Sequence, residues 1–168
     1  MIGNGAFCGC SSLRAVELPD GLEEIGLQAF MGSGLKSVAT QNSVSVIRQG
    51  AFCECKSLRE AVLGESLEAL GSNEHTESGR CRYGVFQGSA LENVRLPFML
   101  RRIERAAFCE CGNLKSIALP DWLEQVGDFC FSASGLTQVV FPVSVREVGA
   151  SAFADCKGLE GVQLNEGL

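Results

Sequence analysis

Apolar residues recur at fixed intervals along the whole chain. Residues 2–19 read IGNGAFCGCSSLRAVELP, and the pattern returns at residues 103–120 as IERAAFCECGNLKSIALP. The units are alternately 23 and 22 residues long, except for the fourth. A period of this size indicates a repeat architecture. We count seven units, which open at Ile2, Ile25, Ile47, Leu70, Ile103, Val126 and Val148.

Each unit contains one strand-like segment. In residues 13–18, apolar positions alternate with variable ones, which is the period of a strand with one buried face. One unit is too small to bury its own apolar side chains, so neighbouring units must stack and pair these strands in parallel. The Ile-Gly-x-x-Ala-Phe stretch predicts turns or a single helical turn on the opposite wall, and pairs such as Leu22 and Ile25 supply the remaining edge. The pattern predicts a parallel-strand solenoid.

Three residue types keep fixed places in the repeat. All four prolines share one position, and cysteine at 10, 55, 111 and 156 alternates with serine at 33, 89 and 134. The full repeat is therefore a pair of units, spaced by 45 residues where nothing is inserted. The fourth unit holds about 11 extra residues, so we expect one domain, residues 1–168, with an insertion at 72–82. Seven of the ten phenylalanines share one further position: Phe7, Phe30, Phe52, Phe86, Phe108, Phe131 and Phe153.

The period Ile-Gly-x-x-Ala-Phe-x-x-Cys-x-x-Leu-x-x-Val-x-Leu-Pro, with its Ser-Gly-Leu variant at residues 33–35 and 134–136, resembles the BspA-like leucine-rich repeat family. The resemblance covers nearly the whole chain and implies a leucine-rich-repeat solenoid. It also implies a binding scaffold, because such repeats occur in bacterial surface antigens and adhesins and in proteins of microbial eukaryotes. The family supplies no catalytic residues. This chain departs from it at residues 72–82 and in lacking recognisable capping units.

Composition and charge exclude several classes of function. Of the 168 residues, 46% are hydrophobic and 20% are charged, which is typical of a folded domain. The net charge of −6 disfavours nucleic acid, because binding there depends on neutralising phosphates. No apolar run approaches the roughly 18 residues of a membrane span, and residues 1–5 lack the pattern of a secretory signal. With one histidine and no phosphate loop or nucleophile elbow, the sequence predicts neither an enzyme nor a cofactor.

Nine cysteines raise the question of metal or disulfide chemistry. Stacked strands lie about 4.8 Å apart, so cysteine pairs in every second unit should be roughly 10 Å apart, too far for a disulfide or a shared zinc ion. We interpret the cysteines at 10, 55, 111, 130 and 156 as small buried hydrophobes, and those at 8, 53 and 109 as partly exposed. Cys81 has no repeat role. The odd count favours a reducing intracellular or organellar compartment, with the cell surface as the alternative.

Two regular surfaces follow from the repeat. The variable positions of the strands are mostly small and uncharged, and the face they form is about 30 Å long. It could accept a protein partner, or its small residues could simply suit a flat sheet. The pairs before each opening residue alternate in charge along the later units, which predicts ion pairs of Arg101 with Glu68 and with Glu124.

The insertion and the arginines around it form the most individual feature. His75 and Cys81 lie in the insertion, but two ligands without a third make a weak metal or nucleophile site. The positive charge could dock an acidic partner, or the insertion could be a solvated loop with dispersed arginines. Trp122 adds an aromatic anchor at a variable position. The candidate partner-binding residues are Arg80, Arg82, Tyr83, Arg95, Arg101, Arg102, Arg105 and Trp122.

The sequence therefore predicts a non-catalytic protein-interaction or scaffold module, a peripheral subunit or fragment of a larger assembly. A repeat region of a cell-surface adhesin is the alternative. The expected partners are proteins, including those of a large membrane-associated complex, without nucleic acid and without direct membrane insertion. Both ends of the repeat look uncapped, so we expect them to be covered by more of the same polypeptide, by other subunits or by copies stacked end to end.

Overall fold

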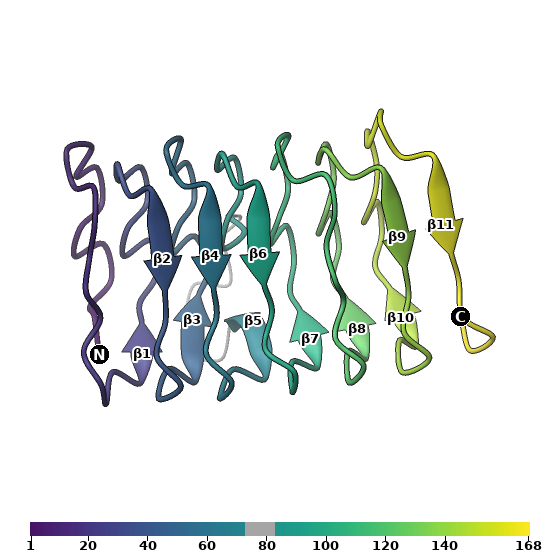
Figure 1. The fold of residues 1–168 in the computed structure, drawn as a ribbon, viewed down its shortest axis with the longest axis horizontal. Helices are drawn as coiled ribbons and strands as arrows, with labels where there is room; N and C mark the ends of the chain where they lie inside the picture. The colour runs from purple at the N-terminus through teal and green to yellow at the C-terminus, as the bar shows by residue number, and fades with distance from the viewer. Residues whose placement is uncertain (73–82) are drawn as a thin grey trace.

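The computed structural model describes residues 1–72 and 83–168. The chain winds into a solenoid whose turns follow one another along a single axis, with the two termini at opposite ends (Figure 1). We number the turns one to seven after the seven repeat units. The described residues form strands and turns, with no helix among them. The predicted parallel-strand solenoid is confirmed.

One continuous parallel sheet runs along the back of the molecule as seen in Figure 1, and we call it the rear sheet. Its register aligns the opening residues of successive units, such as Ile25 with Ile47 and Ile103 with Val126. These side chains are fully buried. The sequence predicted only an edge here, and the structure shows a second sheet. Its strands, in spatial order, are β1 (Glu24–Ile25), β3 (Val46–Arg48), β5 (Ala69–Ser72), β7 (Arg102–Ile103), β8 (Gln125–Val126) and β10 (Glu147–Val148).

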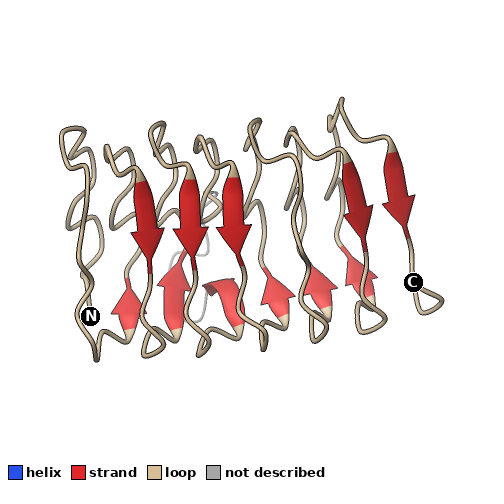
Figure 2. Ribbon diagram, in the orientation of Figure 1, coloured by secondary structure: helices blue, strands red, loops and turns tan. Residues whose placement is uncertain are grey.

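The strands predicted from the Leu-x-x-Val-x-Leu segments lie in front, and we call them the front strands. They form two separate parallel groups. Residues 15–17 of turn one and 116–118 of turn five are not strands, so the prediction of a front strand in every unit was wrong at these two turns. In Figure 2, turn five crosses the front as an unpaired loop. The groups are β2 (Ser37–Ala39), β4 (Glu60–Val62) and β6 (Asn93–Arg95), then β9 (Gln138–Val140) and β11 (Gly161–Gln163).

The third wall carries the repeated phenylalanines. Seven rings stack along the axis from Phe7 to Phe153, with centroids 5.1–5.6 Å apart and nearly parallel planes. The backbone here bonds from turn to turn, as where the Phe30 N–H donates to the Ala51 carbonyl at 2.8 Å. In every turn except the fourth, two residues of this wall take a left-handed conformation that reverses the chain, such as Gln28 and Gly32. The predicted wall of turns is confirmed, and the described residues form no helical turn in it.

The alternation of cysteine and serine has a structural cause. The Cys55 thiol donates to the Phe30 carbonyl of the preceding turn at 3.1 Å and lies 3.4 Å from the Ser33 hydroxyl. Cys111 repeats this arrangement with Phe86 and Ser89. The cysteines are therefore hydrogen-bonding partners inside the core as well as small apolar groups.

The predicted burial of the cysteines holds for part of the set. Cys55, Cys111 and Cys130 are buried as predicted, whereas Cys156 is half-buried. Cys10 is exposed, against the prediction, because it lies on turn one and has no preceding turn in the structure. Of the three cysteines expected at partly exposed positions, Cys8 is exposed, Cys109 is half-buried and Cys53 is buried. Cys81 lies outside the described residues.

Candidate binding surface

The front of the solenoid presents a flat surface of small side chains with shallow hollows. One hollow lies over turns one and two, lined by Ala15, Ser37 and Ala39. Another lies between β9 and β11. A third lies over turns four and five, between Arg95 and Ala118. Small outward side chains line part of the first hollow, whereas the charged Glu65, Arg95 and Asp121 line the third.

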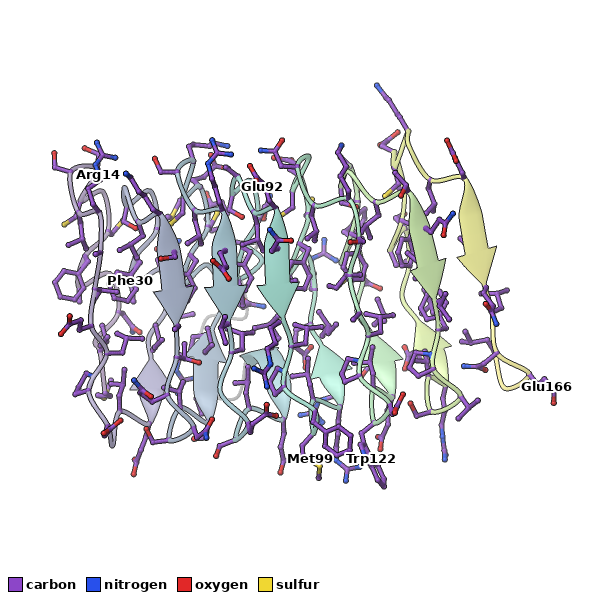
Figure 3. The ribbon with its side chains drawn as sticks, viewed as in Figure 1. Arg14, Phe30, Glu92, Met99, Trp122 and Glu166 are labelled. Carbon is purple, nitrogen blue, oxygen red and sulfur yellow. The ribbon has the colours of Figure 1, made fainter. Side chains whose placement is uncertain are left out.

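An apolar corner borders this surface where the front strands turn toward the rear sheet. Phe98 is 56% exposed, Met99 41%, Trp122 47% and Val143 88%. Met99 and Trp122 project side by side at the lower edge of Figure 3. These four residues, from three consecutive turns, are the apolar corner. A cluster of large apolar side chains that are exposed to solvent is typical of an interaction site.

The same corner is polar in the earlier turns. The positions that correspond to Phe98 and Met99 are held by Asp20 and Gly21 in the first repeat. In the next two repeats they are held by Asn42 and Ser43, and by Glu65 and Ser66. The Ser43 hydroxyl donates to the Leu22 carbonyl, so at least one of these side chains ties one turn to the next. The apolar corner therefore belongs to the later turns alone.

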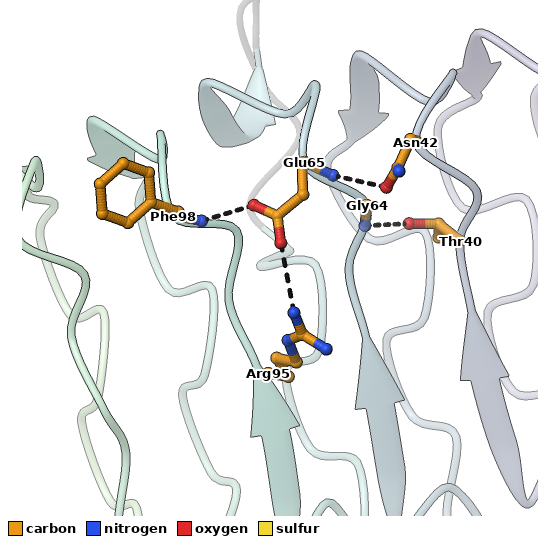
Figure 4. A network of polar contacts seen from close by, with 6 residues as sticks. All are labelled: Thr40, Asn42, Gly64, Glu65, Arg95 and Phe98. Atoms are coloured by element: carbon orange, nitrogen blue, oxygen red, sulfur yellow. Dashed lines mark hydrogen bonds and ion pairs between the residues drawn. The ribbon is translucent and has the colours of Figure 1, made fainter.

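Glu65 fixes the backbone from which Phe98 projects (Figure 4). One carboxylate oxygen accepts the Phe98 N–H at 2.8 Å, and the other lies 3.5 Å from an Arg95 guanidinium nitrogen. The Glu65 N–H in turn donates to the Asn42 side chain at 3.2 Å. The corner is thus held by side chains that each bond to the following turn, and the Phe98 ring is left in solvent.

The described arginines of the candidate site are each paired with a carboxylate. Arg101 lies 2.6 Å from Glu124, which confirms one predicted ion pair, while the predicted pair with Glu68 does not form in the described part of the chain. Arg105 lies 3.4 Å from Asp128 and over the Phe129 ring, 4.6 Å from its centroid. Arg102 pairs with Glu104. The positive charge around turn five is therefore largely offset.

The structure separates the candidate residues into two places. Trp122 is part of the apolar corner, Arg95 lines the hollow beside it, and Arg101 pairs with Glu124, two residues after Trp122. Arg102 lies on the outer face of the rear sheet, and Arg105 lies three residues further along the chain. Tyr83 lies near Gly50 and is exposed. Arg80, Arg82, His75 and Cys81 lie outside the described residues. Sequence analysis missed Phe98, Met99 and Val143, which the appearance of apolar residues at a polar corner position could have revealed.

The thiols are the groups with the clearest electrostatic perturbation. Burial raises the pKa of the Cys111 thiol to about 12 and raises the pKa of the Cys55 and Cys130 thiols as well. These groups stay neutral at ordinary pH. Within residues 1–72 and 83–168, no three His, Cys, Asp or Glu side chains are grouped as metal ligands. The same residues contain no helix long and apolar enough to cross a membrane.

Comparison with known proteins agrees with the repeat. A family model described as BspA type leucine rich repeat region matches residues 1–82 and 79–168 in six copies. No curated protein matches the chain.

Solved structures resemble the whole solenoid. A leucine-rich repeat protein from Bacteroides ovatus is 28% identical, with a TM-score of 0.79, over 96% of this chain and 45% of its own. A leucine-rich repeat protein of T. pallidum is 32% identical, with a TM-score of 0.68, over 77% of this chain and 58% of its own. The pneumococcal vaccine antigen PcpA shares the fold at 19% identity and a TM-score of 0.58, over 99% of this chain and 48% of its own. This chain spans about half the length of these proteins.

Proposed function

Because the chain belongs to the family of BspA type leucine rich repeats, we propose that it is a non-catalytic protein-binding module whose front face receives a protein partner. The observation that supports this most is the apolar corner beside the hollows of the front strands. Aromatic and sulfur-containing side chains of this kind are enriched in the centres of protein interfaces.

The composition of the front face suits a partner that approaches closely. Its outward positions in β2 and β9 are Ser37, Ala39, Gln138 and Val140, all without charge. A partner backbone can approach β2 and β9 without desolvating charged groups, which would be costly. Glu60 on β4 and Arg95 on β6 are the charged outward residues between them. The exposed apolar corner then supplies the apolar area whose burial stabilises the complex.

The role of a peripheral subunit or fragment in a larger assembly is part of this proposal, and so is a non-enzymatic role. The family membership supports an interaction module in general. A surface antigen is the alternative role, and the likeness to the pneumococcal antigen supports only the shared fold.

Site-specific photo-cross-linking tests the front face. Benzoylphenylalanine is placed at Val140, which is exposed on β9, and as a control at Glu147, which is exposed on β10 of the rear sheet. We expect irradiation in the producing cells to join a protein to the Val140 variant and not to the Glu147 variant. Equal adducts from both positions, or adducts from Glu147 alone, would count against a front-face partner.

We also propose the reducing compartment that the cysteine pattern favours. Cys8 and Cys10 are both exposed, so their oxidation state should report the surroundings. The test is acid quenching of the producing cells, followed by alkylation and mass analysis. Both thiols should be alkylated without prior reduction. Labelling that requires a reductant would instead favour the cell-surface alternative.

A further inference from the structure

We propose that the hollow over turns four and five, beside the apolar corner, receives a basic side chain of the protein partner. Its charge pairs with the Asp121 carboxylate, and its aliphatic stem packs against Phe98. We call this hollow the corner hollow. The proposal rests on the proposed front-face function and names the chemistry of the partner segment that meets this end of the face.

The apolar corner is built from the tips of β-turns that begin at the repeat prolines. In turn five, for example, the Leu123 N–H donates to the Pro120 carbonyl at 3.0 Å and closes the turn. Such tips favour Asp, Asn, Ser and Gly, whose side chains or backbone freedom suit a turn. The turn itself therefore gives no reason for an aromatic ring at Phe98 or Trp122. Their exposure points to a contact with another molecule.

The Asp121 carboxylate at one of these tips is not used within the fold. Asn42 and Glu65 hold the same repeat position, and each side chain accepts the backbone N–H of the following turn. The equivalent bond from Asp121 to the Val143 N–H does not form. Asp121 is exposed, and no other described residue makes a hydrogen bond or ion pair with its side chain. Its charge is available to a partner.

The charges in the corner hollow favour a cation. Glu65, Arg95 and Asp121 are its charged lining residues. Glu65 and Arg95 offset each other across 3.5 Å, which leaves the Asp121 charge uncompensated. The hollow is therefore negative, and the net charge of −6 on the whole chain acts in the same direction. Complementary charge steers a basic partner to this surface and repels an acidic one.

The apolar part of the corner hollow favours a cation that is carried on a hydrocarbon stem. Leu96, Ala118 and Leu119 line the hollow together with Phe98. Lysine and arginine lay their stems along apolar surface and keep the charged head at a polar site. An aromatic ring also attracts a cation held over its face. A basic side chain thus makes use of the apolar lining and of Asp121, whereas a small inorganic cation would use the carboxylate alone.

The binding experiment uses the fluorescence of Trp122, which is the only tryptophan of the chain. The probe is an acetylated, amidated tripeptide, Leu-Lys-Leu. In a second peptide norleucine replaces the lysine, which keeps the stem and removes the charge. We expect the norleucine peptide to bind about fivefold more weakly, as the loss of an exposed ion pair and a cation–π contact predicts. A third peptide, Leu-Glu-Leu, should bind more weakly still.

A matched pair of variants locates the charge. Asp121→Asn should weaken binding of the lysine peptide about fivefold and leave binding of the norleucine peptide unchanged. Asp20 is the control, because it is exposed at the same repeat position but is followed by Gly21 in place of tryptophan. Asp20→Asn should bind both peptides like the unmodified protein. Each variant removes one negative charge at an exposed position, so both should fold, and thermal melting checks this.

Several results would overturn the proposal: no fluorescence change with the lysine peptide, equal binding of the lysine and norleucine peptides, or equal losses in the two variants. Tighter binding of the glutamate peptide would assign the hollow to an acidic group at Arg95 and also overturn it. So would concentration-dependent dimerisation without peptide that Asp121→Asn abolishes, because the occupant would then be a second copy. If cross-links from Val140 persist while the lysine peptide fails, the front-face function stands and this proposal alone falls.

Discussion

The rear sheet and the front strands arise from the same seven units, yet only the rear sheet pairs without interruption. Its six strands run from β1 to β10, although several are only two residues long. The front strands are each three residues long and are nevertheless split between β6 and β9. Because the phenylalanine stack and the rear sheet hold neighbouring turns together, the front can lose its pairing at one turn. The stability of the solenoid and the surface available for binding are thus carried by different walls.

The largest expected effect on stability comes from a substitution in the phenylalanine stack at turn five. Phe108 is fully buried between two stacked rings, so Phe108→Ala should lower the free energy of unfolding by about 3–5 kcal/mol. Ile117 belongs to the same turn but lies half-buried in its front segment, so Ile117→Ala should cost about 1–2 kcal/mol. Urea unfolding of both variants measures the difference. Equal losses would show that the front of turn five packs as firmly as the back.

Hydrogen exchange should show the same contrast in the backbone. The amides of Thr40 and Leu96 share one repeat position, but among the described residues only the Thr40 amide has a backbone partner, the Val62 carbonyl. We expect the Leu96 amide to exchange about a hundredfold faster than that of Thr40 under native conditions, because it needs no opening of the sheet. Residue-resolved NMR measures both rates in one sample. Similar rates would mean that the Leu96 amide is protected in solution as well as the Thr40 amide.

The repeat made much of this architecture predictable, since the spacing of Phe30, Phe52 and their equivalents determines which side chains stack. The rear sheet was missed because strands such as β1 are too short to show alternation. The loss of the front strand at turn five has no local signal either: residues 116–118 read Ser-Ile-Ala, close to the Ser-Val-Ala of β2. Whether a strand pairs depends on the turns beside it, which a single segment does not encode.

The candidate site was predictable only in part, because its contacts also depend on how neighbouring turns stack. Trp122 was identified from its place after a proline, and the structure exposes it near Met99. The charges of the arginines were visible in the sequence, but their pairing with carboxylates one turn away depends on stacking distance. The cysteine and serine alternation was visible as well. Its hydrogen bonds appear only when Ser33 and Cys55 are brought together.

Alkaline pH should weaken the core that both sheets share. The Cys111 thiol has a pKa of about 12 in the folded protein, against an ordinary value of 9.0. The unfolded chain therefore releases this proton at lower pH than the folded protein, and stability falls as pH rises above about 9. This group should remove about 1.4 kcal/mol between pH 8 and pH 10.

Urea unfolding at several pH values checks the alkaline effect. Cys55 and Cys130 add to the loss in the unmodified protein, because burial also raises the pKa of their thiols. Cys111→Ser is the control, since serine does not ionise in this range. Its unfolding free energy should decline less steeply between pH 8 and pH 10, and an unchanged slope would mean that Cys111 does not contribute.

The smallest predicted effect concerns the backbone of the phenylalanine wall. Ala133 is exposed and has a φ of 55°, a left-handed conformation that costs most residues about 1 kcal/mol but suits glycine. Ala133→Gly should therefore raise the free energy of unfolding by up to about 1 kcal/mol. Ala39, exposed on the extended strand β2, is the matched control, and Ala39→Gly should lower it by about 0.5–1 kcal/mol. Changes of opposite sign in the free energy of unfolding would show that the backbone is strained at Ala133 and not at Ala39. If both variants lose stability equally, the backbone at Ala133 is not strained.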